Sequence, residues 1–148
     1  MKIRKATCKD IKELSNLLAY LFEQEKEHKA DSQKQGKGLQ SIIANKKIGK
    51  IFVATKQNKI VGMINLLYSV STSLGGRVGI IEDVIVLPKF RGEKIGSKLI
   101  KHVIRYADKK NLKRLTLFTD FDNEKAHKFY EKAGFTKSSM VQFQRGTA

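Results

Sequence analysis

Residues 81–96, IEDVIVLPKFRGEKIG, constrain this chain more than any other stretch, because an apolar strand pattern runs directly into a basic, glycine-containing turn and then a helical pattern. A helix begins with backbone N–H groups that have no partner inside the helix, and the positive end of its dipole lies there. Phosphates bind where such a start follows a tight turn. Arg91 and Lys94 add positive charge beside it. The stretch therefore predicts a strand, an anion-binding turn and a helix.

The order of residues in this turn resembles the acetyl-coenzyme A pyrophosphate loop of the GCN5-related N-acetyltransferase (GNAT) family. The family pattern is Arg or Gln, two residues, Gly, one residue, and then Gly or Ala. Arg91 and Gly96 match this pattern, whereas Lys94 stands where the family usually has its first glycine. The resemblance implies that the coenzyme pyrophosphate is held by six consecutive residues, which are Arg91, Gly92, Glu93, Lys94, Ile95 and Gly96.

A second block, DFDNEKAHKFYEKAGF at residues 120–135, also resembles this family. The resemblance implies that Asn123 hydrogen-bonds the pantetheine arm of acetyl-CoA, and that Tyr130 acts as the general acid for the departing thiolate. Each residue also has a structural interpretation, since an asparagine there can cap a helix and a tyrosine can pack on a sheet. With the opening IRKATCKDIKEL and the segment NKIVGMINLL, the resemblance covers nearly the whole chain.

The periodicity of apolar residues predicts a single α/β (α+β) domain over residues 1–148, with a mixed, mostly antiparallel sheet. About four helices flank the sheet. The first opens at Thr7 and Asp10 and ends near His28, the second is a short helix over 39–44, the third follows residue 95, and the fourth spans 123–133. About six strands are expected, over 2–6, 50–56, 60–70, 77–86, 113–119 and 138–143. The last strand is exposed in this arrangement and could pair across a homodimer.

Acyl transfer to an amine requires that the ammonium lose a proton before nitrogen attacks the thioester. Glu82 and Asp83 interrupt the apolar strand, and its alternation sends them to opposite faces, so we expect one of them to meet the acceptor. The resemblance favours Glu82, nine residues before Arg91, as general base in a ternary complex with direct attack. A structural ion pair for either carboxylate, or proton transfer through water, remains open. The resemblance also assigns oxyanion and coenzyme contacts to the backbone of Val84, Ile85 and Val86.

The single cysteine, Cys8, excludes an internal disulfide, and the three histidines (28, 102 and 127) do not have the spacing of a metal site. We therefore expect no metal cofactor and a reducing, cytoplasmic setting. The N-terminal MKIRKATCKD lacks the apolar stretch of a signal peptide, and no run is long enough to span a bilayer. Secretion and membrane insertion are disfavoured on this basis.

The formal net charge of +16 raises nucleic acid as a rival partner. Lysines are spread from Lys2 to Lys137, without the stripe of interleaved aromatics that single-strand binders use for stacking, so nucleic acid is the less favoured prediction. A second alternative is a non-catalytic relative that binds coenzyme A, which Lys94 at the usual glycine position would explain. The acceptor amine stays open, although IEDVIV resembles the glucosamine-phosphate acetyltransferase branch locally.

Overall fold

The computed structural model describes residues 1–24 and 30–146. They fall into two compact units, Met1–Phe118 and Thr119–Ala148. The first unit is a five-stranded sheet covered by helices, and the second contains one helix and the C-terminal segment. The predicted end of the first helix, near His28, lies outside the described residues.

The sheet has its strands in sequence order, β1 (Lys2–Lys5), β2 (Gly49–Lys56), β3 (Lys59–Ser71), β4 (Gly76–Val86) and β5 (Leu115–Leu117). The first four strands pair antiparallel, and β5 pairs with β4 in parallel. The tight connection between β2 and β3 places Gln57 and Asn58 at positive φ, as two-residue hairpin turns require. The prediction of a mixed, mostly antiparallel sheet is confirmed.

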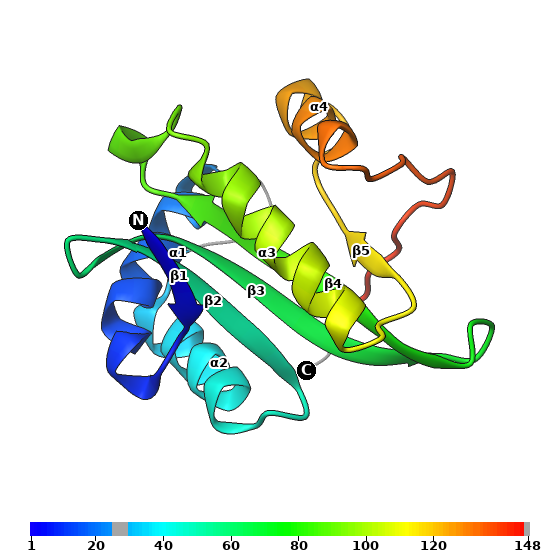
Figure 1. Ribbon diagram of the computed structural model, residues 1–148, viewed down its shortest axis with the longest axis horizontal. Helices are drawn as coiled ribbons and strands as arrows, with labels where there is room; N and C mark the ends of the chain where they lie inside the picture. Colours follow the sequence, from blue (N-terminus) through cyan, green and yellow to red (C-terminus); the bar gives the residue numbers. More distant parts are fainter. Residues whose placement is uncertain (25–29, 147–148) are drawn as a thin grey trace. The chain divides into compact units, whose positions relative to one another are not determined.

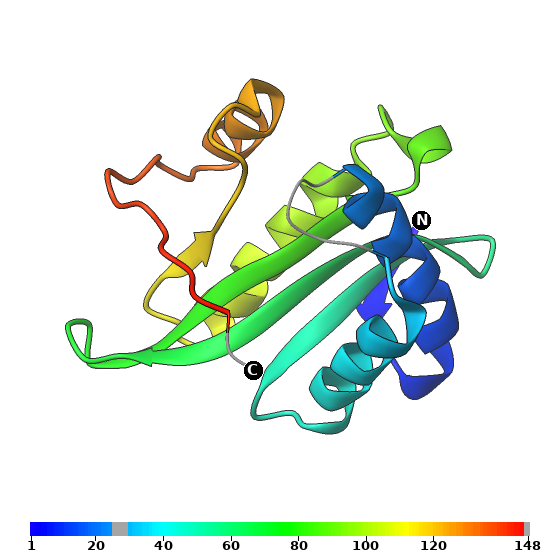
Figure 2. The same cartoon turned by 180° about the vertical axis from the view of Figure 1, so that it is seen from behind.

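Helices cover both faces of this sheet. Figure 1 shows α3 (Ile95–Lys109) in front of the strands, and Figure 2, seen from behind, shows α1 (Ile11–Gln24) and α2 (Ser32–Ala44) on the other face. On the α1 and α2 face, Leu14, Leu17 and Leu39 pack against Met63 and Ile85. On the α3 face, the buried apolar positions of the helix are Ile95, Leu99, Ile100, Val103 and Ala107, whereas Ile104, which the periodicity also predicts in this stripe, is half-buried.

The entry into α1 follows the predicted capping box. Asp10, only 7% exposed, accepts the Thr7 backbone N–H at 2.7 Å and a bidentate pair from Arg4 at 2.8 and 3.0 Å. A short 3-10 turn, η1 (Cys8–Asp10), carries the chain from this cap into the helix. The Arg4 hydrogen bond is the main reason that the pKa of Asp10 lies below its ordinary value. The cap thereby ties α1 to β1.

The second helix is longer than predicted, because it begins at Ser32 and not near Leu39. Asp31 is its N-cap and accepts hydrogen bonds from the backbone N–H groups of Gln33 (3.1 Å) and Lys34 (3.2 Å). Such a cap satisfies donors that the helix start leaves unpaired. The helix start was not predicted because residues 32–38 are polar and contain two glycines, and the first buried apolar residue of the helix is Leu39.

The second unit holds α4 (Glu124–Lys132), which Asn123 caps and after which Gly134 adopts φ +103°. Both boundaries agree with the prediction. The strand predicted over 138–143 is wrong, because residues 135–146 form neither helix nor strand. Within its own unit this segment has no strand to pair with, and Met140, Val141 and Phe143 are 80–93% exposed. The homodimer expected from that strand stays a prediction.

Across residues 1–24 and 30–146, none of the helices has the length and apolar character needed to cross a bilayer. The same residues contain no cluster of three His, Cys, Asp or Glu side chains that could hold a metal ion.

Candidate active site

The centre of the candidate site is the edge of β4. Strand β5 pairs only with Gly79–Ile81, so in the described first unit no strand lies beside residues 82–86 on that side. On the other side, β4 pairs with β3 as Leu66 with Ile81 and Asn65 with Asp83, which leaves Glu82 as one extra residue. Glu82 is therefore the additional residue of a β-bulge, a feature that re-aims a strand locally.

The bulge changes which backbone groups face the open edge of residues 82–86. Before it, the Gly79 N–H donates to Arg114 O at 2.8 Å, on the β5 side. After it, the Leu87 N–H donates to Val61 O at 2.9 Å, on the β3 side. Because hydrogen-bonded pairs alternate along an antiparallel ladder, the N–H groups of Val84 and Val86 point to the open edge, whereas that of Ile85 points to β3.

The two predicted carboxylates have different surroundings. Glu82 is exposed, whereas Asp83 is half-buried and accepts a hydrogen bond from Asn65 Nδ2 at 3.0 Å. Asn65 is only 4% exposed, and its buried Oδ1 has no hydrogen-bond partner in the structure. The sequence analysis missed Asn65, although a lone amide inside the apolar run IVGMINLL is an available signal. The alternation that would send Glu82 and Asp83 to opposite faces is interrupted at the bulge.

The loop that was predicted to bind an anion has the predicted strand-to-helix geometry. A 3-10 turn, η2 (Pro88–Phe90), leads to Arg91, whose Nε donates to Val86 O at 3.2 Å. Gly92 has φ +90°, and Lys94 caps α3 in the left-handed region at φ +62°. The position that the family usually fills with glycine thus has the backbone conformation that favours glycine, and here a lysine adopts it.

The remaining residues of this loop are placed as follows. Glu93 forms an ion pair with Lys56 of β2. Ile95, the first residue of α3, is buried with 3% exposure. Gly96 is half-buried in the first turn of the helix. The helix starts without a side-chain cap, so its first N–H groups have no partner from a capping side chain. Such N–H groups at the positive end of the dipole can receive an anion.

Two predicted site residues belong to the second unit. Asn123 Oδ1 accepts the Ala126 N–H at 3.1 Å, so the helix-capping interpretation describes its contact. Tyr130 is half-buried, with its ring in edge contact with Phe129 (5.1 Å) and Phe135 (6.0 Å). Burial raises the pKa of Tyr130 to about 12. Its hydroxyl therefore stays protonated across the neutral range and can donate a hydrogen bond or a proton.

The chain is similar to known acetyltransferases in sequence and in fold. The sequence profile of the acetyltransferase (GNAT) family matches residues 11–135. An aminoalkylphosphonate N-acetyltransferase of Salmonella typhimurium is 31% identical over 86 residues, 58% of this chain and 56% of that protein. A glucosamine 6-phosphate N-acetyltransferase of Trypanosoma brucei brucei is 36% identical over 89 residues, 60% of this chain and 58% of that protein.

The chain thus matches little more than half the length of these two curated relatives. Among solved structures, a possible acetyltransferase from Clostridium difficile 630 superimposes with a TM-score of 0.90, with 99% of this chain and 97% of that chain covered. Its sequence is 22% identical, so it supports the fold alone. Since the family profile covers most of the sequence, the chain belongs to the acetyltransferase (GNAT) family.

Proposed function

We propose that this protein transfers an acetyl group from acetyl-CoA to an amine, by direct attack in a ternary complex. The observation that carries this proposal is the bulge at Glu82 on an open edge of β4, from which the chain runs directly into the loop of residues 91–96. A strand edge offers unpaired N–H groups to an extended ligand, and a helix start offers them to phosphates. Acetyl-CoA contains both an extended pantetheine arm and a pyrophosphate.

The open edge also supplies a way to stabilise the transition state. Attack on the thioester carbonyl places negative charge on its oxygen, which preorganised N–H donors can stabilise. The N–H groups of Val84 and Val86 point to this edge, so we assign the oxyanion contact to them and not to Ile85. Removal of a single such donor from an enzyme typically costs about 10²–10³ in kcat.

Glu82 is the proposed general base. As the additional residue of the bulge it is exposed, where a carboxylate can reach an incoming ammonium group directly or through one water molecule. Asp83 instead is held by Asn65, which suits orientation of the acceptor. The orphaned Oδ1 of Asn65 can accept a hydrogen bond from the acceptor, since a buried acceptor without a partner is costly.

Tyr130 is the proposed general acid. Collapse of the tetrahedral intermediate releases the coenzyme as a thiolate, which a phenol can protonate. The Tyr130 hydroxyl carries its proton at neutral pH, which is the form that a general acid requires. Asn123 is proposed to contact the pantetheine arm from the start of α4, while it also caps that helix.

The relatives and the charge support a proposal for the acceptor class. The names of both curated relatives describe acceptors that carry an amine together with a phosphonate or phosphate. A net charge of +16 attracts such anions. We therefore propose a small primary amine that bears a phosphate or phosphonate group.

The test is a coupled thiol-release assay with acetyl-CoA and a panel of amines, which includes glucosamine 6-phosphate, aminoalkylphosphonates and their uncharged counterparts. We expect turnover with phosphorylated amines, and a loss of about 100-fold in kcat for both Glu82→Gln and Tyr130→Phe. Lys12→Gln, an exposed change on α1, serves as the control and should retain activity. Coenzyme binding by calorimetry without turnover on any amine would show a non-catalytic relative, and no coenzyme binding by the folded protein would refute the proposal.

A further inference from the structure

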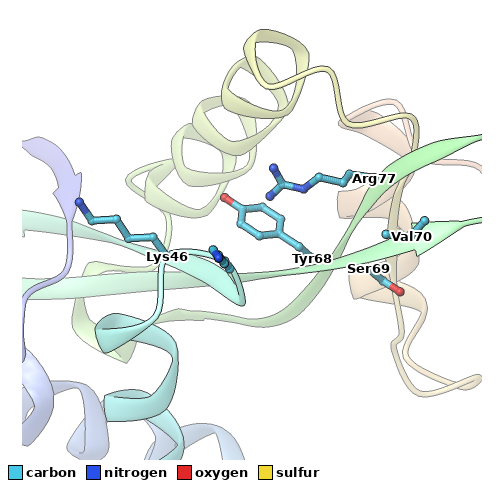
Figure 3. A pocket seen from close by; sticks show the side chains of 6 residues that line it. Lys46, Tyr68, Ser69, Val70 and Arg77 are labelled. Carbon is cyan, nitrogen blue, oxygen red and sulfur yellow. The ribbon is translucent and has the colours of Figure 1, made fainter.

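The C-terminal end of α3 covers a hollow that the proposed reaction does not use. It has a volume of about 280 Å³ and is lined by two tyrosines, Tyr68 and Tyr106, and by five cations, Lys5, Lys46, Lys50, Arg77 and Lys110. A second hollow, of about 440 Å³, shares Lys46, Tyr68 and Arg77 and adds Lys47 (Figure 3). Among residues 1–24 and 30–146, no carboxylate lines either of them. We call the two together the basic pocket.

The register of the sheet brings these cations to one face. Lys5 lies opposite Phe52, and Lys50 lies two residues before Phe52 on β2, so all three share a face. The ring of Phe52 contacts His102 (4.7 Å) and Tyr106 (5.1 Å) of α3, which identifies it as the α3 face. Two strands therefore each place a lysine beneath the end of the helix.

The next two strands complete the pocket. The hydroxyl of Tyr68, on β3, lies 2.7 Å from that of Tyr106. Arg77, on β4, places its guanidinium carbon 4.1 Å from the centre of the Tyr68 ring, and Figure 3 shows the two side by side. Lys110, just after α3, has its ammonium 5.8 Å from the Tyr106 ring. Four neighbouring strands and one helix end thus contribute to a single site.

The tyrosine pair is a hydrogen-bond donor to any anion in the pocket. Burial, and secondly the bond with Tyr106, raise the pKa of Tyr68 above its ordinary value, so its hydroxyl stays protonated. In a pair of protonated phenols, one hydroxyl donates to the other, and the accepting hydroxyl keeps its own proton for a third group. An anion beside the pair can take that proton as a hydrogen bond.

The pocket gathers positive charge without compensation. The pKa of Lys50 lies below its ordinary value, mainly because the side chain is buried and secondly because Lys5, Lys46 and Lys110 lie nearby. The C-terminus of α3 contributes only about half a negative charge. The one acid in its last turn, Asp108, is exposed and lies about 200° around the helix from Tyr106. Like charges held together destabilise the fold, and a bound anion would relieve that repulsion.

The pocket is far from the coenzyme loop. Helix α3 has 15 residues and separates the loop at its start from the pocket at its end by about 22 Å. One coenzyme pyrophosphate therefore cannot occupy both places.

We propose that the basic pocket binds a small polyanion with two or three linked phosphates, either free or carried by a nucleotide. The hollow beneath the end of α3, of about 280 Å³, is close to the lower end of small-ligand pockets, about 300 Å³, and suits a phosphate chain more than a macromolecular surface. Arg77 supplies a forked set of donors that matches phosphate oxygens, while the lysines supply compact charges around it.

The test measures binding of inorganic tripolyphosphate and of adenosine triphosphate by calorimetry. The pocket variant is Lys50→Gln with Arg77→Gln, and the matched control is Lys9→Gln with Lys12→Gln, which removes the same charge from exposed positions outside the pocket. We expect at least tenfold weaker binding in the pocket variant and less than twofold in the control. Tyr68→Phe, which keeps charge and packing, should weaken binding several-fold. If the double variant does not fold, this single variant tests whether the polyanion binds in the pocket.

Amide chemical shifts locate the ligand independently of any acetyl transfer. Shifts centred on residues 50, 68, 77 and 110 support the proposal, whereas shifts centred on 92–96 refute it. Equal weakening in the pocket and control variants would also refute it, since the attraction would then be diffuse charge. Equal affinity for both phosphates means that the phosphate chain suffices, and tighter binding of the nucleotide means that the nucleotide is the source. Pocket-dependent binding of a single-stranded oligonucleotide, without binding of tripolyphosphate, would overturn the proposal in favour of nucleic acid.

Discussion

At its N-terminal end, α3 begins after a loop in which Gly92 and Lys94 have positive φ, and the donors offered to a ligand are backbone N–H groups. At its C-terminal end, the same helix covers the basic pocket, where the donors are lysine, arginine and tyrosine side chains. The first arrangement is specified by six consecutive residues. The second depends on the pairing of four strands and on the packing of the helix over them.

This difference determines how each end responds to change. A backbone site survives substitution of most side chains, provided that the turn conformation is kept. A side-chain site is lost when one strand slips or the helix shifts, because a register change of one residue moves every side chain to the other face. We therefore expect the two ends of α3 to be separable by mutation.

The largest effect expected is that of Phe52→Ala. Phe52 is 1% exposed and contacts His102 and Tyr106 in the second half of α3, so its truncation should lower the free energy of unfolding by about 3–5 kcal/mol. Urea denaturation measures this loss. Among molecules that remain folded, polyanion binding should weaken more than acetyl-CoA binding.

Leu99→Ala is the matched control for this comparison. Leu99 is fully buried near the first half of α3, where its Cδ1 lies close to Gly62, and its truncation should cost about 2–5 kcal/mol. Here acetyl-CoA binding should be the more affected of the two. If both variants weaken both ligands equally, the two ends of the helix do not act as separate sites.

The next effect concerns the loop itself. Arg91→Ala removes an exposed guanidinium that is anchored on Val86 O, and we expect acetyl-CoA to bind about 10–100-fold more weakly, since hydrogen bonds to charged groups contribute about 1.5–3 kcal/mol. Calorimetric titration measures the change. Lys89→Ala, which removes an exposed cation two residues earlier, should weaken binding less than threefold. Comparable weakening by the variant with Lys50→Gln and Arg77→Gln would contradict separate sites.

Most of the fold could be predicted from local patterns. Strand alternation, the helical stripe after residue 95 and the cap at Thr7 and Asp10 each depend on neighbouring residues, and the structure contains the corresponding elements. The strand predicted over 138–143 failed because a strand needs a partner, and a β-rich sequence cannot show whether one is present. The early start of α2 was missed because the prediction relied on apolar periodicity, whereas the N-cap at Asp31 starts the helix in a polar segment.

The candidate site divides in the same way. The loop of residues 91–96 could be predicted because its conformation and charge depend on one short segment. The bulge at Glu82, the Asn65 contact with Asp83 and the basic pocket could not, because they depend on pairs that are far apart in the chain. In the sequence the lysines are spread evenly, and the register of the sheet together with the packing of α3 gathers five cations around the two tyrosines.

A smaller effect is expected at Lys94. A non-glycine residue in the left-handed region lowers the free energy of unfolding by about 1–2 kcal/mol. Replacement by glycine recovers only part of this, because glycine has a larger conformational entropy in the unfolded chain. Lys94→Gly should therefore raise the free energy of unfolding by about 0.5–1 kcal/mol. Lys94→Ala removes the same charge and keeps the strained φ, so the difference between the two variants in urea denaturation isolates the backbone contribution. Equal stability of the two would show that the loop relaxes around alanine.

The smallest effect expected is a pH dependence of the free energy of unfolding that arises from His102, in the second half of α3. Burial, followed by Arg105 and Lys109, lowers the pKa of His102 below its ordinary value of about 6.5. The unfolded chain then binds a proton more readily than the folded one, so stability is complete above about pH 6.5 and falls as the pH drops toward the folded pKa.

Urea denaturation between pH 5 and 7.5 tests this expectation. His102→Gln should reduce the slope of stability against pH in this window, whereas Lys94→Gly should leave that slope unchanged. The carboxylate of Asp10, whose pKa is lowered, loses its contribution only as the pH falls below about 4, outside the window. An unchanged slope in His102→Gln would mean that burial and the neighbouring Arg105 and Lys109 do not oppose protonation of His102, which would contradict the expectation.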